Sequence, residues 1–196
     1  MLTQVFRLFT QSDVEVNNCY MQQYASVFKP TEVHMMLAAF SNIETIHISA
    51  YSHLLDTLVM PETEYEAFLH NKEKTDKWIY MRGFNVDSER DIAKTMAMFG
   101  AFTEGLQLFS SFAILLNIPR FNKMKGMGQI VAWSVRDETL HMQSLVRLFK
   151  TFISETPEVW DEDPEHELYS ACDTVVYHED AFIDLAFELH RVEGLS

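Results

Sequence analysis

The sequence contains one short pattern twice, as Glu44-Thr45-Ile46-His47 and as Glu138-Thr139-Leu140-His141. The pattern Glu-x-x-His occurs nowhere else in the chain. On an α-helix, side chains three positions apart lie on the same face, so each tetrad can present a carboxylate and an imidazole side by side. Because both tetrads lie within long stretches of helical periodicity, they indicate two helices that carry polar groups among apolar ones.

Proline and capping residues divide the rest of the sequence into helical stretches. The chain has 6 glycines and 5 prolines among 196 residues, which favours a few long elements over many short ones. Helices are expected over about residues 2–28, 31–58, 62–82, 88–119, 127–154 and 168–194, with Thr31 and either Asp87 or Ser88 as N-caps. This order predicts an all-α fold with a single helical domain over residues 1–196.

The composition excludes several classes of protein. Asp and Glu number 29 against 15 Lys and Arg, and this formal net charge of −14 argues against binding to nucleic acid or to an anionic membrane. Cys19 and Cys172 lie far apart and no signal peptide is recognisable, so a reducing cytoplasm is the expected compartment. No uninterrupted apolar run reaches the length of a transmembrane helix.

Four of the expected helices each carry a carboxylate near the middle of an otherwise mostly apolar face. These acids are Asp13, Glu44, Glu104 and Glu138. A buried carboxylate without a compensating charge costs several kcal/mol, so four of them would cancel much of the roughly 5–15 kcal/mol that keeps a domain folded. No lysine or arginine lies on these faces at the same level. Two divalent cations would balance the four carboxylates, with His47 and His141 completing the coordination.

The spacing of the acids indicates two similar hairpins. Asp13 precedes Glu44 by 31 residues and Glu104 precedes Glu138 by 34, so each half supplies an acid and then a tetrad. One acid from each of two helices and Glu-x-x-His from each of two others is the pattern of di-iron and dimanganese carboxylate bundles. The alternative is a set of scattered polar residues, since a single acid on an apolar face is more often partly exposed than a ligand. Two tetrads, two further acids and matched spacing together favour a dinuclear metal site.

Three segments resemble the small, radical-generating subunit of class I ribonucleotide reductase, which belongs to the ferritin-like superfamily. They are ETIHISAYSH at 44–53, FTEGLQLFSSFA at 102–113 and VRDETLH at 135–141. The resemblance runs from about Thr10 to Ser196 and implies a ferritin-like helical bundle with a dinuclear metal site. The metal ligands that it implies, called the six predicted ligands below, are Asp13, Glu44, His47, Glu104, Glu138 and His141.

The resemblance also assigns roles to two further residues. Tyr51 falls at the position of the family's radical tyrosine, one helical turn after the first tetrad, with Leu108 and Phe112 able to surround it with carbon. The alternative for Tyr51 is a buried tyrosine whose hydroxyl bonds to a neighbouring acid. Asp137 falls at a position that hydrogen-bonds a metal-bound histidine in the family. The alternative for Asp137 is a surface acid paired with Arg136.

The resemblance implies an oxidoreductase that works with a partner. Oxygen or a reduced oxygen species reacts with the reduced metals, and the oxidised centre generates a radical at Tyr51. A separate large (alpha) subunit uses that radical to reduce ribonucleotides to the deoxyribonucleotides needed for DNA replication. The centre is expected to hold two iron ions, with two manganese ions or a manganese/iron pair as alternatives that these ligand types also accept. A homodimer is expected from the family alone.

Two other functions stay open from the sequence. One is a related di-metal oxidase acting on a small or lipid-like ligand, and the other is a ferritin-like metal storage protein in which Tyr51 only packs. Asp13, at a place where ferritins usually have glutamate, and the placement of Tyr51 argue against storage. Typical small subunits have an N-terminal segment with a tryptophan and a C-terminal tail with a tyrosine, and neither is visible here. The chain is therefore expected to be a fragment, an unusually short homologue or the ordered core of a longer chain.

Overall fold

Most helix boundaries in the computed structural model follow the prolines and capping residues of the sequence, but the last helix begins at Glu162 and not near residue 168. The structure describes residues 2–58, 83, 85–160, 162–189 and 194. Its elements are α1 (Leu2–Asn18), η1 (Cys19–Tyr24), α2 (Ala25–Val27), α3 (Thr31–Thr57), α6 (Glu89–Ala97), η2 (Met98–Gln107), α7 (Phe109–Asn117), η3 (Ile118–Phe121), α8 (Lys125–Glu155), η4 (Pro157–Val159) and α9 (Glu162–Leu189). These described residues contain no strand, which confirms the all-α prediction.

The predicted N-caps have different outcomes. Ser88 caps α6, because its hydroxyl accepts a hydrogen bond from the backbone N–H of Asp91 at 3.1 Å. The prediction that Thr31 caps α3 is wrong, since Thr31 is the first helical residue and no side chain caps this end. Pro30 takes the capping position instead, with the φ of −59° to which its ring restricts it. The helix expected over 62–82 lies outside the described residues.

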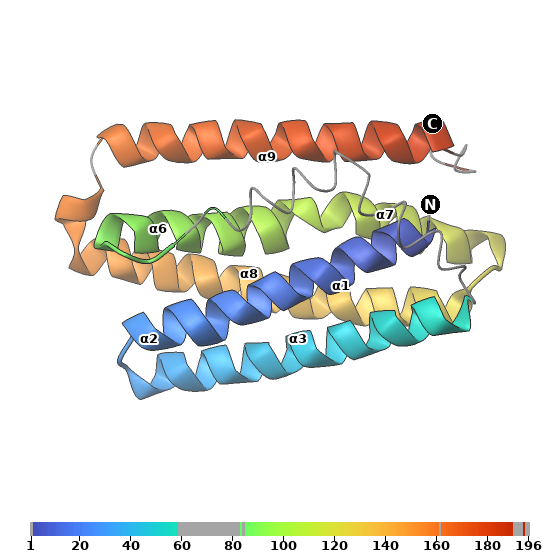
Figure 1. Ribbon diagram of the computed structural model, residues 1–196, viewed down its shortest axis with the longest axis horizontal. Helices are drawn as coiled ribbons and strands as arrows, with labels where there is room; N and C mark the ends of the chain where they lie inside the picture. The colour runs from blue at the N-terminus through green and yellow to red at the C-terminus, as the bar shows by residue number, and fades with distance from the viewer. Residues whose placement is uncertain (1, 59–82, 84, 161, 190–193, 195–196) are drawn as a thin grey trace.

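The helices form two hairpins, as the spacing of the acids predicts (Figure 1). The run from α1 through η1 to α2 lies antiparallel to α3, and the run from α6 through η2 to α7 lies antiparallel to α8. Contacts between α3 and α8 join the two hairpins, and α9 packs against α6 and η2. The bundle therefore brings an acid-bearing helix and a tetrad-bearing helix from each hairpin to one shared interior.

The apolar faces predicted from helical periodicity point into this interior. The buried residues on them include Leu37, Phe40, Glu44, His47, Tyr51 and Leu54 of α3 and Val131, Ser134, Glu138, His141 and Leu145 of α8. The carboxylates at positions 13, 44, 104 and 138 are each at most 3% exposed. The helical registers expected from the sequence are thus confirmed, and the acids are buried rather than partly exposed.

The helix expected over 88–119 is not a regular α-helix. Between α6 and α7, the segment η2 has π-helical geometry, and π segments often occur at functional sites. Gly100 in η2 lies directly against α8, where a Cβ on this residue would come within 2.7 Å of the Leu145 Cβ. Periodicity analysis assumes 3.6 residues per turn throughout, so it does not detect a segment whose turns are wider.

Replacing Gly100 with alanine should destabilise the bundle by about 1–3 kcal/mol, because α8 would have to move to accommodate the new methyl group. Gly126→Ala is the matched control, since nothing lies within 4 Å of a Cβ added there. That control should leave the free energy of unfolding unchanged or raise it by up to about 1 kcal/mol, because alanine is the better helix former. Denaturant unfolding of the metal-free proteins measures both, and equal stability of the two variants would contradict the close approach.

One described helical stretch, Glu89–Phe121, is long and apolar enough by length and composition to cross a membrane. Core helices of globular proteins pass the same test, and 56% of the apolar window of this stretch is buried inside the protein. The stretch includes η2 and the buried Glu104, so it contributes an acidic side chain to the interior of the bundle.

Candidate metal centre

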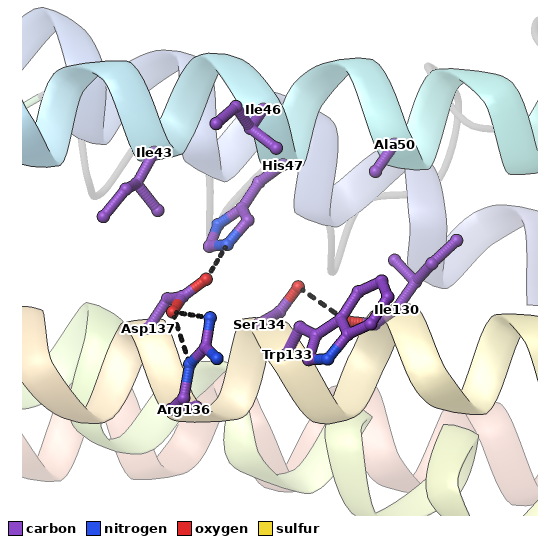
Figure 2. Close-up of a pocket in the computed structure, with 9 residues that line it drawn as sticks. All are labelled: Ile43, Ile46, His47, Ala50, Ile130, Trp133, Ser134, Arg136 and Asp137. Atoms are coloured by element: carbon purple, nitrogen blue, oxygen red, sulfur yellow. Dashed lines mark hydrogen bonds and ion pairs between the residues drawn. The ribbon is translucent and has the colours of Figure 1, made fainter.

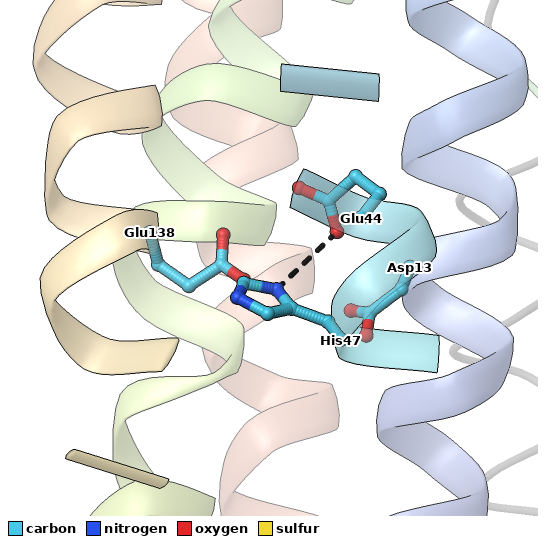
Figure 3. A group of neighbouring side chains, drawn as sticks. All are labelled: Asp13, Glu44, His47 and Glu138. Carbon is cyan, nitrogen blue, oxygen red and sulfur yellow. Dashed lines mark ion pairs between the residues drawn. The ribbon is translucent and has the colours of Figure 1, made fainter. Parts of the chain in front are cut away.

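The six predicted ligands converge from four elements on the middle of the bundle. Their donor atoms form two groups, and within each group all of these atoms lie within 4.8 Å of one another. The first group is Asp13, Glu44, His47 and Glu138, and the second is Glu44, Glu104, Glu138 and His141. Figure 3 shows the first group, with Asp13 on α1, Glu44 and His47 on α3, and Glu138 on α8. Since Glu44 and Glu138 belong to both groups, the arrangement is that of two adjacent sites with two shared carboxylates.

Several donor atoms in these groups lack ordinary hydrogen-bond partners. His141 Nδ1 lies 2.9 Å from Glu44 Oε1, and His47 Nδ1 lies 3.0 Å from Glu138 Oε1. Neither of these two Nδ1 atoms makes a hydrogen bond with acceptable geometry. One carboxylate oxygen each of Asp13, Glu44 and Glu104 also lacks a hydrogen-bond partner. Buried polar atoms normally find such partners. Donor atoms that lie this close together with hydrogen-bonding capacity left unfilled fit a pair of cations bound among them.

The donor set also fits transition metals chemically. Each group contains three carboxylates and one imidazole, a ligand mixture that suits iron and manganese. Within the two donor groups themselves, a protonated histidine is the one source of positive charge that the protein supplies. The residues present therefore fit a dinuclear metal centre.

Without metal, burial and the mutual charges of the cluster shift the pKa values of its acids and histidines. Burial, followed by repulsion from Glu44 and Glu138, raises the pKa of Asp13 well above its usual range. Burial and repulsion from Glu138 likewise raise the pKa of Glu104. Although burial disfavours the imidazolium form, neighbouring carboxylates raise the pKa of His47 to about 11 and that of His141 to about 10. Burial opposes ionisation of Glu138 as well, but its contacts with both histidines prevail and lower its pKa.

Metal binding should therefore release protons. Both histidines are protonated at neutral pH in the metal-free protein because their pKa values, about 11 and about 10, lie above 7. An imidazole must lose that proton before its nitrogen can bind a metal ion, so the apparent metal affinity should fall as the pH is lowered. Calorimetric titration with Co²⁺ in buffers of different ionisation enthalpy counts the protons released. Binding with no proton release would show that the histidines are not ligands.

Tyr51 lies beside the cluster in a carbon-lined environment. It is 1% exposed, and its ring centroid lies 6.3 Å from that of His47. The rings of Phe6 and Phe9 pack against it at 6.1 and 5.2 Å, and Leu108 and Phe112 belong to the same core cluster. The expected carbon wall is thus present, and α1 adds two phenylalanines that the sequence analysis did not assign to it.

The hydroxyl of Tyr51 bonds to a serine rather than to an acid. It donates a 2.7 Å hydrogen bond to Ser134 Oγ, across the interface between α3 and α8. Burial, followed by the nearby carboxyl group of Asp13, raises the pKa of this phenol well above its usual range, so the phenol keeps its proton at neutral pH. Ser134 lies on the same buried face of α8 as Glu138 and His141, and a small polar residue among apolar ones was the available signal for its role.

Asp137 lies at the outer edge of the site, next to His47. Its Oδ2 is 3.4 Å from His47 Nε2, the ring nitrogen opposite the one that lies near Glu44 and Glu138. Arg136 donates to the other oxygen of Asp137, from Nε at 3.0 Å. Figure 2 shows these contacts at a pocket between α3 and α8 that Trp133 also lines. Asp137 is therefore paired with Arg136 and also faces a predicted ligand, and its role toward a metal-bound histidine stays a prediction.

Comparison with known proteins identifies the family. Residues 1–196 match the family described as ribonucleotide reductase, small chain. The chain belongs to the ribonucleotide reductase small-chain family. Membership confirms the ferritin-like class of the bundle and agrees with the buried cluster of acids and histidines.

Proteins similar to this chain come from viruses, bacteria and animals. A probable ribonucleoside-diphosphate reductase small subunit of Invertebrate iridescent virus 6 is 42% identical over 100% of this chain and 59% of the viral protein. Its counterpart in Invertebrate iridescent virus 3 is 40% identical over 100% of this chain and 56% of the viral protein. The ribonucleoside-diphosphate reductase subunit beta of Halalkalibacterium halodurans is 26% identical over 76% of this chain and 45% of the bacterial protein. The chain thus spans little more than half the length of the two viral relatives.

Proposed function

We propose that this chain carries the radical-generating metal centre of a class I ribonucleoside-diphosphate reductase small subunit. The observation that supports this most directly is the pair of donor groups with Glu44 and Glu138 in common, next to a fully buried tyrosine. Family membership and the names of the viral relatives support the same activity. A storage protein would need the acids but not the carbon-lined phenol.

The six predicted ligands would hold the two metal ions. Asp13 and His47 would bind one ion, Glu104 and His141 the other, and Glu44 and Glu138 both. When bound in reduced form, such a metal pair supplies the electrons for oxygen activation and then an oxidising equivalent for a nearby phenol. Iron is the expected metal, with manganese or a mixed pair as alternatives for the same donors.

Tyr51 would lose one electron and its phenolic proton to become the stored radical. The hydrogen bond to Ser134 sets the direction in which this hydroxyl points before oxidation. Phe6 stacks on the ring and Phe9 packs against it at a tilt, and both would keep water and reductants away from it. Asp137 would orient His47 through its Nε2, as carboxylates commonly do for metal-bound imidazoles.

The radical would serve a separate large subunit, which would hold the ribonucleotide and the residues that reduce it. We further propose that the small subunit forms a homodimer and works in the cytoplasm. These proposals rest on the family, because the described residues come from one copy of one chain.

Electron paramagnetic resonance tests the proposal. The protein is loaded anaerobically with Fe²⁺, exposed to air and frozen. A tyrosyl signal, followed by reduction of a ribonucleoside diphosphate when the large subunit from the same source is added, is the expected result. If neither iron nor manganese gives a radical despite full metal uptake, the storage or oxidase function replaces the proposed one.

A further inference from the structure

A second buried phenol lies at the cluster, on the side of Glu104. Tyr20 in η1 is 0% exposed, and its hydroxyl donates a hydrogen bond to Glu104 Oε1. The ring of Tyr20 meets the ring of His141 edge to face, with centroids 6.2 Å apart, and that of Phe40 at 6.0 Å. Tyr20 therefore contacts two members of the same donor group without being one of the six predicted ligands.

Glu104 depends on this contact. It is 0% exposed, and its Oε2 has no hydrogen-bond partner among the described residues. Among the described residues, Tyr20 donates the hydrogen bond that Glu104 Oε1 accepts. A carboxylate held at one oxygen cannot rotate freely about its last side-chain bond, and the bond to the phenol competes with binding of both oxygens to one metal ion.

The two phenols near the cluster therefore differ in their partners. The Tyr51 hydroxyl bonds to Ser134, which is not a predicted ligand, so its hydrogen bond does not hold a carboxylate in place. The Tyr20 hydroxyl bonds directly to a predicted ligand. Tyr24 lies next to Tyr20, with ring centroids 6.4 Å apart and the same complete burial. Its hydroxyl makes no hydrogen bond to any of the six predicted ligands within the described residues.

We infer that Tyr20 is a positioning residue of the metal centre, which orients Glu104 and restricts it to binding its metal ion through one oxygen. This inference rests on the proposed metal centre. Orientation of a ligand by a hydrogen-bonded neighbour is a general requirement of metal sites, and loss of such a neighbour typically lowers metal affinity by about 10–100-fold.

Cobalt binding to the full chain tests the inference, because Co²⁺ reports both affinity and coordination number through its visible absorption. Tyr20→Phe removes only the hydroxyl and should lower the affinity for one of the two Co²⁺ ions by about 10–100-fold. The visible absorption of Co²⁺ bound to this variant should also weaken, because Glu104 can then bind the ion through both oxygens and so raise its coordination number. Tyr24→Phe removes the same atom from an equally buried neighbour and should match the unmodified protein in both measurements.

A double-mutant cycle separates positioning from a general structural effect. If Tyr20 acts through Glu104, Tyr20→Phe should have no further effect on cobalt affinity in a Glu104→Asp background, where a carboxylate for the metal remains but is drawn back from the Tyr20 hydroxyl. Additive losses would overturn the inference, as would identical cobalt affinity and absorption in Tyr20→Phe and Tyr24→Phe. An intense tyrosinate-to-iron charge-transfer band in the Fe³⁺-loaded protein, absent from Tyr20→Phe, would overturn it in favour of direct metal binding by Tyr20.

A measurement that leaves Tyr20 in place covers the case in which Tyr20→Phe does not fold. The test uses a Tyr51→Phe protein with isotope-labelled tyrosine. The vibrational frequency of the phenolic C–O stretch of Tyr20, which is bonded to Glu104, should shift when Co²⁺ is added. The absence of any shift would overturn the inference. If the unmodified protein binds no cobalt at all, the proposed metal centre fails as well. Normal cobalt binding with no effect of Tyr20 would overturn this inference alone.

Discussion

Glu138→Ala should abolish binding of both metal ions, whereas Glu104→Ala should abolish binding of only one. Glu138 belongs to both donor groups and Glu104 to the second group alone, although both are completely buried acids. Glu138 Oε1 also lies 3.0 Å from His47 Nδ1, and its Oε2 lies 3.4 Å from His141 Nδ1. Figure 3 shows Glu138 beside His47. Metal content per chain, measured by mass spectrometry after anaerobic loading with Fe²⁺ and removal of free metal, gives the result directly.

The metal-free Glu138→Ala protein should also be less stable, by about 3–5 kcal/mol, because two protonated histidines lose their shared carboxylate. Glu138→Gln keeps the size and shape of the side chain and covers the case in which the alanine variant does not fold. Glu167→Ala, which removes an exposed acid that pairs with Arg90, should leave the metal content unchanged. Full metal content in both Glu138 variants would refute the assignment of this residue.

Tyr51→Phe should retain both metal ions and lose the tyrosyl radical completely. The hydroxyl removed bonds to Ser134 and not to a predicted ligand, so metal binding does not depend on it. Phenylalanine fills almost the same space against Phe6 and Phe9, so the carbon wall stays intact. Paired measurements of metal content and of the electron paramagnetic resonance spectrum after air exposure separate the two properties.

Tyr24→Phe is the matched control for the radical, because it removes a hydroxyl from another fully buried tyrosine of the same bundle. It should keep the full signal with an unchanged line shape. If Tyr51→Phe retains the signal and Tyr24→Phe loses it, the radical belongs to the tyrosines of η1. Loss of metal in Tyr51→Phe would instead show that this phenol supports the centre itself.

The sequence was informative about the helices because local rules govern them. The alternation of three and four positions placed Glu44, His47 and Tyr51 on one buried face of α3, and their burial confirms this register. The same rule located Asp13 and Glu104 on helices far away in the chain. It failed at η1 and η2, whose turns are wider than the 3.6 residues that the rule assumes. It also misplaced the cap of α3, where Pro30 took the position expected for Thr31.

By itself, the sequence determined the residue types of the site, the helices that carry them and the face on which each lies, because helical periodicity is a property of neighbours along the chain. Only the tertiary structure decided how these faces meet. The sharing of Glu44 and Glu138 between two donor groups depends on how far α3 and α8 are rotated and shifted against each other. The bonds of Tyr51 to Ser134 and of Tyr20 to Glu104 join residues 83 and 84 positions apart. Such pairs follow from the interlocking of side chains between packed helices, which no spacing within one helix specifies.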